Sequence, residues 1–558
     1  MILETRTMPG LEGAAASRVR VLLNFSRDQM PTDIRGYHQR TKHAPTRYAL
    51  GPAFLDWTSQ PSPYRLFADA PQIVLPLIAS VDPSPFPGPA QSSAALDRDA
   101  IALFLELAFG LSAWKSAEGS TWALRNNPSS GNLHPTEAYV VLDATPRVGE
   151  TAALYHYAPL AHALEARASY AADLVLPPGG FLLALTSIPW REAWKYGERA
   201  FRYCQLDAGH AVGAAAQAAA ALGWRAEMLP AVSDDELEAL LGLSRPDAWH
   251  RREAEHADLL LWISRNGASP ATLDLQSLTD APRIWHGRAN HISEDHDGWP
   301  LVDLAVQFCR KLRSAPIAPA APRHPLTPVA GASIEACVRR RRSAQRMDGA
   351  TPISREAFAA MLAATLPSAA PLLDGFVWPP AITLVIFVHR VDGTEPGLYV
   401  LGRDEQIAAR LRASASRQFE WAPVDLEGLP LYRLRADPVE REATRLSCLQ
   451  GIAGKGCFSV AMIAEFDAAL DAEGAFAYRR LHWEAGLIGQ AFYLWASALG
   501  VAGTGIGCFF DDEVHALLGL SPASTQFQDI YHFTVGAAIE DARILTLPPY
   551  PRERWIRQ

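Results

Sequence analysis

The residues best suited to hold a ligand lie in one short stretch, residues 125–135, which reads RNNPSSGNLHP. Prolines at 128 and 135 stiffen its backbone, and Gly131 can turn where a side chain would clash. Its hydroxyl and amide side chains can donate hydrogen bonds to an anionic or carbonyl-rich ring without adding charge. An apolar run at residues 138–142 follows, so we expect a polar loop held by a buried strand. A solvated turn is the alternative for this loop taken alone.

Two further stretches carry residue types suited to the same site. Residues 341–343 (RRS) could complete it, although residues 339–342 alone could be the solvated start of a basic helix. Lys195 and Tyr196 could supply a base, because a lysine removed from water, or a tyrosine assisted by lysine, can accept a proton. The alternative for this pair is an ordinary surface position beside a helix.

Composition and charge exclude several classes of protein. The chain has 558 residues, 49% hydrophobic and 20% charged, which is typical of a globular protein with more than one domain. Its formal net charge of −9 argues against a nucleic-acid or membrane-surface binder. No apolar run is long enough to span a membrane, and the first residues do not resemble a secretory signal. The six cysteines form no C-x-x-C pair, which predicts reduced thiols in a cytoplasmic protein and no metal site.

The elements that must position these residues follow from local patterns. Apolar spacing predicts a helix over residues 96–111 and a long helix from about 198 to 222. Residues 138–142 and 181–185 read as strands, and the first 75 or so residues read as an irregular extension. Prolines recur every third position through residues 314–329, the period of polyproline II, which predicts a semi-rigid spacer.

The chain also repeats itself after this spacer. Adding 277 to a position in the first half gives its counterpart in the second half over a long stretch without gaps. Residues 234–236 (DDE) match 511–513, and residues 239–244 (ALLGLS) match 516–521. Two copies of one α+β domain are therefore predicted, and a fused pair of this kind can pack as an intramolecular two-fold dimer.

These motifs, in this order, resemble the FMN-dependent nitroreductase superfamily, and in particular its SagB-type azoline dehydrogenases, which oxidise thiazoline and oxazoline rings in modified peptides. The resemblance implies an α+β fold of two nitroreductase-like domains, each with a central sheet flanked by helices. We expect an extension over residues 1–90, domains over 91–270 and 331–550, and a linker over 271–330. It also implies a small-molecule or peptide substrate and biosynthetic partner enzymes.

The family's motifs are shared unequally between the halves. Residues 128–132 carry the P-S-S motif, but the first half has residues 85–87 (PFP) where R-R-S should stand. The second half has R-R-S, but residues 372–376 (LLDGF) replace P-S-S. Gly507 and Cys508 stand where the family faces flavin N5, whereas their first-half counterparts are Pro230 and Ala231, and proline lacks an N–H. One complete site, and therefore one FMN per chain, is expected.

The resemblance assigns roles residue by residue. The guanidinium groups and the hydroxyl of R-R-S would bind the phosphate of FMN, with Arg543 as a further base, and Gln345 stands where the family usually has a basic residue. Lys195 and Tyr196 would be catalytic, and only the first half has them. The implied cofactor-binding residues are Pro128, Ser129, Ser130, Asn132, Arg341, Arg342, Ser343, Gln345, Gly507, Cys508 and Arg543. Asp207 and His210, three apart on one predicted helix, are interpreted as structural.

Three functions stay open at this point. The leading one is a dehydrogenase that removes a proton from an azoline-like or amino-acid-derived substrate while hydride moves to flavin. A nitroreductase-like enzyme would instead take hydride from NAD(P)H and reduce an acceptor. A catalytically inactive scaffold that binds a peptide or partner enzymes is the alternative from another class.

Overall fold

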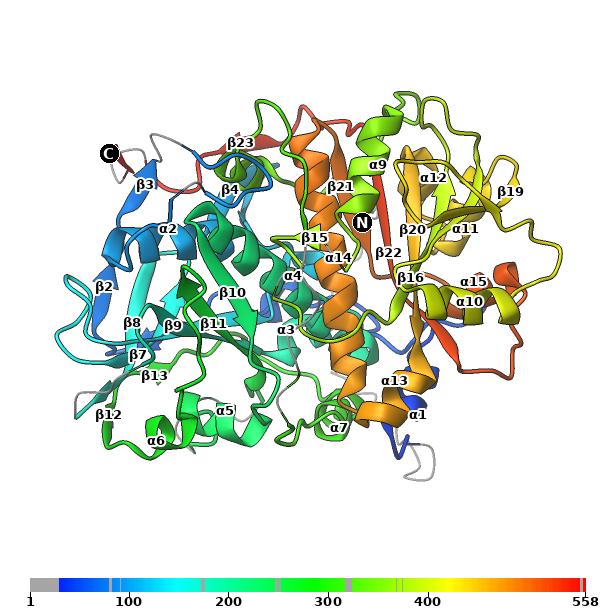
Figure 1. The fold of residues 1–558 in the computed structure, drawn as a ribbon. Helices are drawn as coiled ribbons and strands as arrows, with labels where there is room; N and C mark the ends of the chain where they lie inside the picture. Colours follow the sequence, from blue (N-terminus) through cyan, green and yellow to red (C-terminus); the bar gives the residue numbers. More distant parts are fainter. Residues whose placement is uncertain are drawn as a thin grey trace.

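The computed structural model describes residues 30–79, 83–90, 92–171, 176–245, 249, 252–315, 317, 324–367, 369–373, 375–551 and 555–557. Its two halves lie side by side, each built on an antiparallel sheet, with two long helices between them (Figure 1). Much of the proline-rich spacer predicted over residues 314–329 lies outside the described residues. No helix in the described parts of the chain is both long and apolar enough to cross a membrane.

The first sheet has the strand order β10-β11-β9-β6-β7-β8-β12, and β2 pairs with β8 as well. Its core strands are almost continuously buried, which explains their runs of Leu, Val and Ala. The bounds are β2 Gln72–Val74, β6 Thr136–Leu142, β7 Ala153–Ala158, β8 Ala163–Tyr170, β9 Gly180–Ser187, β10 Trp224–Met228, β11 His256–Arg265 and β12 Arg283–Trp285.

The second sheet has the order β18-β19-β17-β16-β20-β22-β21. Six of its strands correspond one by one to β8, β7, β6, β9, β11 and β10 of the first sheet, and all pair antiparallel. The predicted repeat is therefore confirmed at the level of topology. The bounds are β16 Ile382–Val388, β17 Gly397–Leu401, β18 Ala422–Pro423, β19 Leu431–Ala436, β20 Phe458–Glu465, β21 Ala502–Ile506 and β22 Phe527–Gly536.

The helices repeat in the same way. Asp97 caps the amide of Ala100 and starts α2, close to the start predicted from the sequence. The eight-residue helices α3 and α13 correspond residue by residue at the offset of 277. The bounds are α2 Arg98–Phe109, α3 Pro189–Tyr196, α4 Ala200–Ala221, α5 Asp234–Leu241, α9 Arg355–Ala363, α13 Phe466–Glu473, α14 Ala477–Ala498 and α15 Asp511–Leu518, whereas α8 Ile334–Arg340 has no helical counterpart among the described residues of the first half.

Smaller elements complete the halves. Outside the repeat, the helices are α1 Ile34–Arg40, α6 Leu275–Asp280, α7 Pro300–Phe308, α10 Glu405–Ser414, α11 Glu440–Leu446 and α12 Gly451–Lys455, with short 3-10 turns η2 Trp57–Ser59, η3 Ser130–Asn132 and η4 Gly197–Arg199. The remaining strands are β1 Phe67–Ala68, β3 Leu77–Ala79, β4 Leu111–Ala117, β5 Ser120–Arg125, β13 Arg288–Ala289, β14 His324–Pro325, β15 Ala369–Ala370, β23 Leu545–Leu547 and β24 Trp555–Arg557.

Helices α4 and α14 pack against each other at the centre of the molecule (Figure 1). Gly209 lies against the backbone of Trp483, and its repeat counterpart Gly486 lies against the backbone of Leu206. A side chain on either glycine would collide with the facing helix, so the close approach requires glycine on both sides. The two contacts are related by the same offset of 277, as expected for an intramolecular two-fold pair.

Two buried ion pairs join the halves with the same symmetry. Arg202 on α4 binds Asp511 at the start of α15, and Arg479 on α14 binds Asp234 at the start of α5, each at 2.7 Å. Burial opposes ionisation of Asp511, but the guanidinium groups of Arg199 and Arg202 outweigh it and hold the pKa of this carboxyl well below its ordinary value. Each half is therefore tied to the first turn of a helix in the other.

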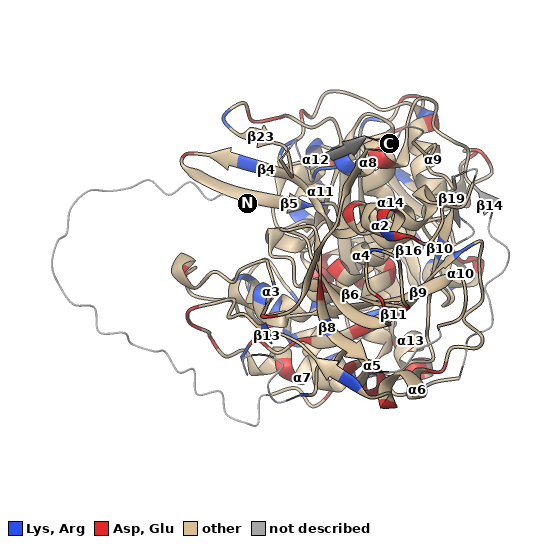
Figure 2. Cartoon of the chain, turned by 90° about the vertical axis from the view of Figure 1, so that its left-hand side faces the viewer, with Lys and Arg blue, Asp and Glu red and all other residues tan. Residues whose placement is uncertain are grey.

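Both ends of the described chain cross between the halves. Helix α1, in the extension, contacts the second half through its Arg35, which forms an ion pair with Asp467. At the other end, β23 pairs with β4 and β24 pairs with β3, both in the first half. Strands β4 and β5 form a hairpin that projects from the body of the molecule (Figure 2). The domain limits proposed from the sequence stay predictions, but the first and last described segments each contact the opposite half.

The central helix contact provides a test of stability. Replacing Gly486 with Ala should lower the midpoint of thermal unfolding, because the added methyl group forces the two backbones apart at a cost of about 1–3 kcal/mol. The matched control is Gly451→Ala, at a position where an added methyl group would have no heavy atom within 4 Å. Equal midpoints for the two variants would contradict the proposed packing constraint.

Candidate functional site

The P-S-S loop is shaped by its own hydrogen bonds. The hydroxyl of Ser129 accepts a hydrogen bond from the amide of His134 at 2.8 Å. Asn132 donates to the carbonyl of Ala123 at 2.9 Å, and its side-chain oxygen contacts the ring of His134 at 3.0 Å. Gly131 has a φ of 61°, in the left-handed region that glycine adopts easily. Pro128 is buried, whereas Ser129, Ser130 and Asn132 are half-buried, so the loop presents polar groups at an accessible edge.

The R-R-S segment of the second half meets this loop region. Arg341 is buried and donates to the carbonyls of Arg125 and Asn126, directly before the P-S-S motif, at 3.1 and 3.2 Å. Ser343 shares a hydrogen bond of 2.7 Å with the hydroxyl of Tyr493 on α14. The two sequence motifs that we assigned to one site are therefore brought together across the two halves.

Arg342 lies beside Arg341 and has no acidic partner in the part of the chain that the structure describes. Its guanidinium donates to the carbonyl oxygens of Ser112, Arg339 and Arg341, at 2.6 to 2.8 Å. Burial, and then the neighbouring charge of Arg341, lowers the pKa of Arg342 to about 10, so the group stays charged at neutral pH. Among the described residues, neither arginine forms an ion pair with a carboxylate. A nearby anion would relieve this repulsion.

Gly507 and Cys508 form a wall that faces helix α4. Gly507 packs against the ring of Tyr203, where a side chain would not fit, and its carbonyl accepts a hydrogen bond from Arg199 at 3.2 Å. The interaction of Cys508 with the neighbouring thiol of Cys448 lowers the pKa of Cys508. This wall comes from the second half, whereas Tyr203 and Arg199 belong to the first.

Lys195 and Tyr196 lie against the P-S-S loop. A Cβ atom at Gly131 would lie 2.7 Å from the hydroxyl of Tyr196 and 3.2 Å from Nζ of Lys195. The ring of Tyr196 contacts that of Tyr203, with 4.4 Å between their centroids. Through Tyr203 the pair is connected to the wall at Gly507, so residues of both halves surround it.

Two buried carboxyl groups lie behind this pair. Asp207 on α4 accepts hydrogen bonds from the amide and the hydroxyl of Ser130, both at 3.1 Å. Burial raises the pKa of Asp207 to about 7, although hydrogen bonds from Ser129 and Ser130 oppose the shift. Glu192 on α3 is fully buried, and burial raises its pKa well above the ordinary value.

Sequence reasoning missed Glu192 and Tyr203 and interpreted Asp207 as structural only. One signal could have found them: at the offset of 277, Glu192 corresponds to Ala469 and Tyr203 to Arg480. The comparison that singled out Lys195 and Tyr196 would have selected these positions too. His210, by contrast, bonds to Gln490 and Tyr531 of the second half, at 3.3 and 3.0 Å, in the packing between the helices.

Gln345 and Arg543, two of the predicted cofactor-binding residues, make none of the contacts described above. Gln345 is exposed. Arg543 lies on an exposed turn before β23 and forms an ion pair with Asp541 at 2.6 Å. Their assignment to the site stays a prediction.

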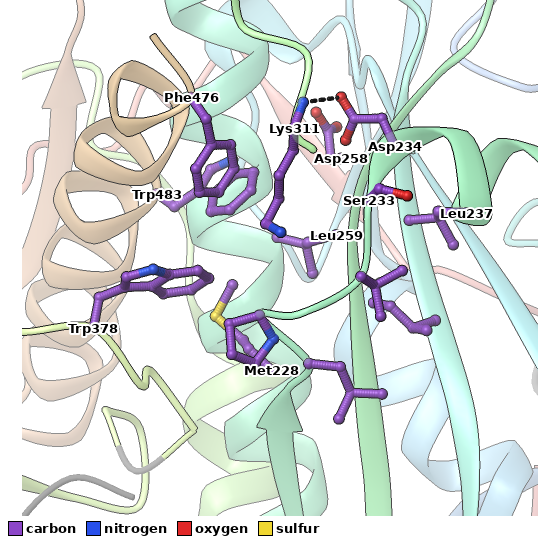
Figure 3. Close-up of a pocket in the computed structure, with 14 residues that line it drawn as sticks. Met228, Ser233, Asp234, Leu237, Asp258, Leu259, Lys311, Trp378, Phe476 and Trp483 are labelled. Carbon is purple, nitrogen blue, oxygen red and sulfur yellow. Dashed lines mark hydrogen bonds between the residues drawn. The ribbon is translucent and has the colours of Figure 1, made fainter. Parts of the chain in front are cut away.

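The corresponding region on the other side of the pseudo-two-fold axis is narrowed to a small pocket (Figure 3). Pro230, the counterpart of Gly507, borders a cavity of about 20 Å³, roughly the space of one water molecule. The side chains of Trp378, Phe476 and Trp483 crowd this cavity, and Gly375, in the segment that replaces P-S-S, packs onto the backbone of β10. This region has no room for a second large planar ligand.

Comparisons with known proteins agree with this architecture. A putative nitroreductase from Anabaena variabilis aligns with a TM-score of 0.65 and 22% identity, over 90% of this chain and 99% of its own. Much weaker likenesses include the E. coli microcin synthetase McbBCD complex, with a TM-score of 0.24 and 19% identity over 33% of this chain and 69% of that one. The NADPH:FMN oxidoreductase of Vibrio harveyi gives a TM-score of 0.22 and 13% identity, over 38% and 69%. No curated protein matches the chain.

The first likeness shows that the fold is shared over nearly the whole length of both chains. The two weaker ones support no argument about function. The nitroreductase family model matches residues 92–250 and 338–537, one stretch in each half and more than half of the chain in total. The chain therefore belongs to the nitroreductase family, whose members are flavin oxidoreductases.

Proposed function

We propose that this protein is an FMN-dependent dehydrogenase with one composite active site, which oxidises an azoline-like ring or a related amino-acid- or peptide-derived substrate. One observation carries the proposal: the Lys195–Tyr196 pair lies against the P-S-S loop, on the side where the second half contributes Gly507 and Cys508. A reductase driven by NAD(P)H has no need of a half-buried lysine base. Enzymes that modify the same peptide are the partners that this function implies.

The residues present fit FMN. Arg341 and Arg342 carry two charges without a carboxylate among the described residues, and one nitrogen of Arg341 has no hydrogen-bond partner there. A phosphate accepts from such groups, so Arg341, Arg342 and Ser343 would hold it. The P-S-S loop and the wall at Gly507 and Cys508 would hold the ring. Bound FMN supplies the acceptor for two electrons.

The two candidate bases differ in their protonation. Burial lowers the pKa of Lys195, and the nearby Glu192 opposes this shift only in part. Burial, and then Glu192, raises the pKa of Tyr196 well above its ordinary value. Of the two, Lys195 is therefore the better base near neutral pH, and Tyr196 stays a neutral hydroxyl that can orient the substrate.

The number of flavins tests the composite site. Denaturation of the protein should release FMN at about one per chain, because only one side of the pseudo-dimer brings the R-R-S segment and the P-S-S loop together. Flavin absorbance against protein concentration, with chromatography of the released flavin, measures this ratio. Two FMN per chain would contradict the composite site, and the absence of flavin would favour a scaffold.

Phosphate recognition by R-R-S can be tested by substitution. The double variant Arg342→Ala, Ser343→Ala should bind FMN at least about tenfold more weakly, because hydrogen bonds to charged groups contribute roughly 1.5–3 kcal/mol each. Arg417→Ala, which removes a charge from an exposed position of the second half, is the control and should bind like the parent. If fluorescence titrations give the parent and the double variant the same affinity for FMN, Arg342 and Ser343 do not bind its phosphate.

The catalytic pair can be separated from cofactor binding. Lys195→Ala and Tyr196→Phe should retain FMN but slow its reduction by a synthetic peptide carrying one thiazoline ring, by roughly 10²–10⁴-fold for the lysine variant. Stopped-flow absorbance follows the reaction. Dithionite, which needs no base, should reduce both variants at the parent rate. Reduction of the parent by NADPH but not by the peptide would favour the reductase instead.

A further inference from the structure

Glu192 is an unusual carboxyl group in this fold. It is 0% exposed, and neither of its side-chain oxygens has a hydrogen-bond partner among the described residues. An ionised carboxylate in such a place would cost far more free energy than a folded domain can spare, so the group instead takes up a proton. A neutral acid is therefore held at the rear of the active site.

The charged and titratable groups that face Glu192 come from two helices. On its own helix, α3, they are Arg191, Lys195 and Tyr196. On α4 they are Asp207 and Cys204. Arg191 is already bound to Glu137 at 2.5 Å and to the carbonyls of Ser62 and His134, at 2.9 and 2.6 Å.

Lys195 follows Glu192 by three residues, so both side chains lie on one face of α3. Asp207 approaches the same face from α4 and holds Ser130 of the P-S-S loop. An orphaned acid, a second acid bonded to the loop, and the lysine are therefore grouped between α3, α4 and the loop. Because neither oxygen of Glu192 bonds directly to a described residue, a proton passes between the lysine and the loop through rotation of the Glu192 side chain or through a bridging water.

The repeat supplies an internal comparison. In the second half, Ala469 and Ala472 stand where the first half has Glu192 and Lys195, so the acid and the lysine are absent together. Glu484, the counterpart of Asp207, forms an ion pair with Arg403 and accepts a hydrogen bond from the amide of Ala381 at 3.0 Å. Glu473, the counterpart of Tyr196, is also paired, with Arg480. Both carboxylates at these positions of the second half thus have an arginine partner, whereas Glu192 and Asp207 form no ion pair with an arginine among the described residues.

We propose that Glu192 and Asp207 form a proton-storing pair behind Lys195, in which Glu192 is a positioning residue that stays neutral between turnovers, so that it does not hold a proton on the lysine, and that accepts the proton of the lysine after each turnover. This inference rests on the proposed function, in which Lys195 is the base. It adds a residue and a route for the proton that the base removes.

The protons balance over one cycle. Lys195 gains an N–H bond as the C–H bond of the substrate breaks. Glu192 then gives its own proton to Asp207, which releases one to solvent at the half-buried loop, and the ammonium of Lys195 returns its proton to Glu192. The net result is one proton moved from substrate to solvent, with both acids and the amine restored.

The stored proton is testable without any reaction. Unfolding releases the proton of Glu192 above the ordinary glutamate pKa of 4.5, so the parent should lose stability as the pH rises, by up to about tenfold in the unfolding constant per pH unit. Glu192→Gln, which has no proton to release, lacks this contribution. The unfolding midpoint of the FMN-loaded variant should therefore rise relative to the parent between pH 5 and 8. A difference that does not change with pH would overturn the proposal.

Kinetics with the thiazoline peptide test the link to Lys195. Glu192→Gln should lower kcat by at least about tenfold and alter its pH profile, with KM unchanged. Glu335→Gln is the matched control, because Glu335 is another buried carboxyl with one oxygen unpartnered among the described residues, on α8. It should keep the parent kcat. Parent-like kinetics in Glu192→Gln, or an equal loss in the control, would overturn the proposal.

The two proposals fail in distinguishable ways. If Lys195→Ala reduces its flavin at the parent rate, the lysine is not the base and the proposed function fails. The pH-dependent stability difference would still report whether Glu192 carries a proton, because it involves no substrate.

Discussion

The structure depends on the close contact between α4 and α14. Glycines on both helices allow the backbones to touch, and the reciprocal ion pairs of Arg202 with Asp511 and of Arg479 with Asp234 bind each helix to the opposite half. A buried ion pair is costly unless both partners are fully engaged, so these contacts favour one arrangement of the halves over any shifted one. The pseudo-two-fold axis is thereby defined, and with it the two places where an active site could form.

The two places have equivalent backbone surroundings but carry different side chains. On one side, Arg199 reaches the carbonyl of Gly507, and Tyr203 packs where a larger residue at 507 would collide. On the other side, Phe476 and Pro230 occupy the corresponding positions and close the space with apolar side chains. The aromatic groups at this unused site add buried apolar area, which stabilises the fold.

The candidate active site, by contrast, keeps charged groups that lack a partner of opposite charge. It keeps a guanidinium pair without a carboxylate and two acids without a guanidinium, in the parts of the chain that the structure describes. Buried charged groups without a partner of opposite charge weaken the folded state. Because they are kept on one side and not on the other, we interpret that side as selected for its chemistry. The contacts of the last described segments with the opposite half and two inter-half ion pairs offer the rigidity that holds them in place.

The sequence by itself determined the fold family, the duplication and the unequal sharing of motifs, because these depend on residue identity at fixed spacing. Helix α2 and strand β6 could be predicted for the same reason, since capping and apolar periodicity act locally. Only the tertiary structure decided which carboxyl groups have partners. Glu192 and Glu484 are both ordinary glutamates in the sequence, and their difference arises from Arg403, more than 200 residues from Glu192, which reaches one and not the other. Long-range packing sets burial and charge pairing, and these set the protonation on which the chemistry depends.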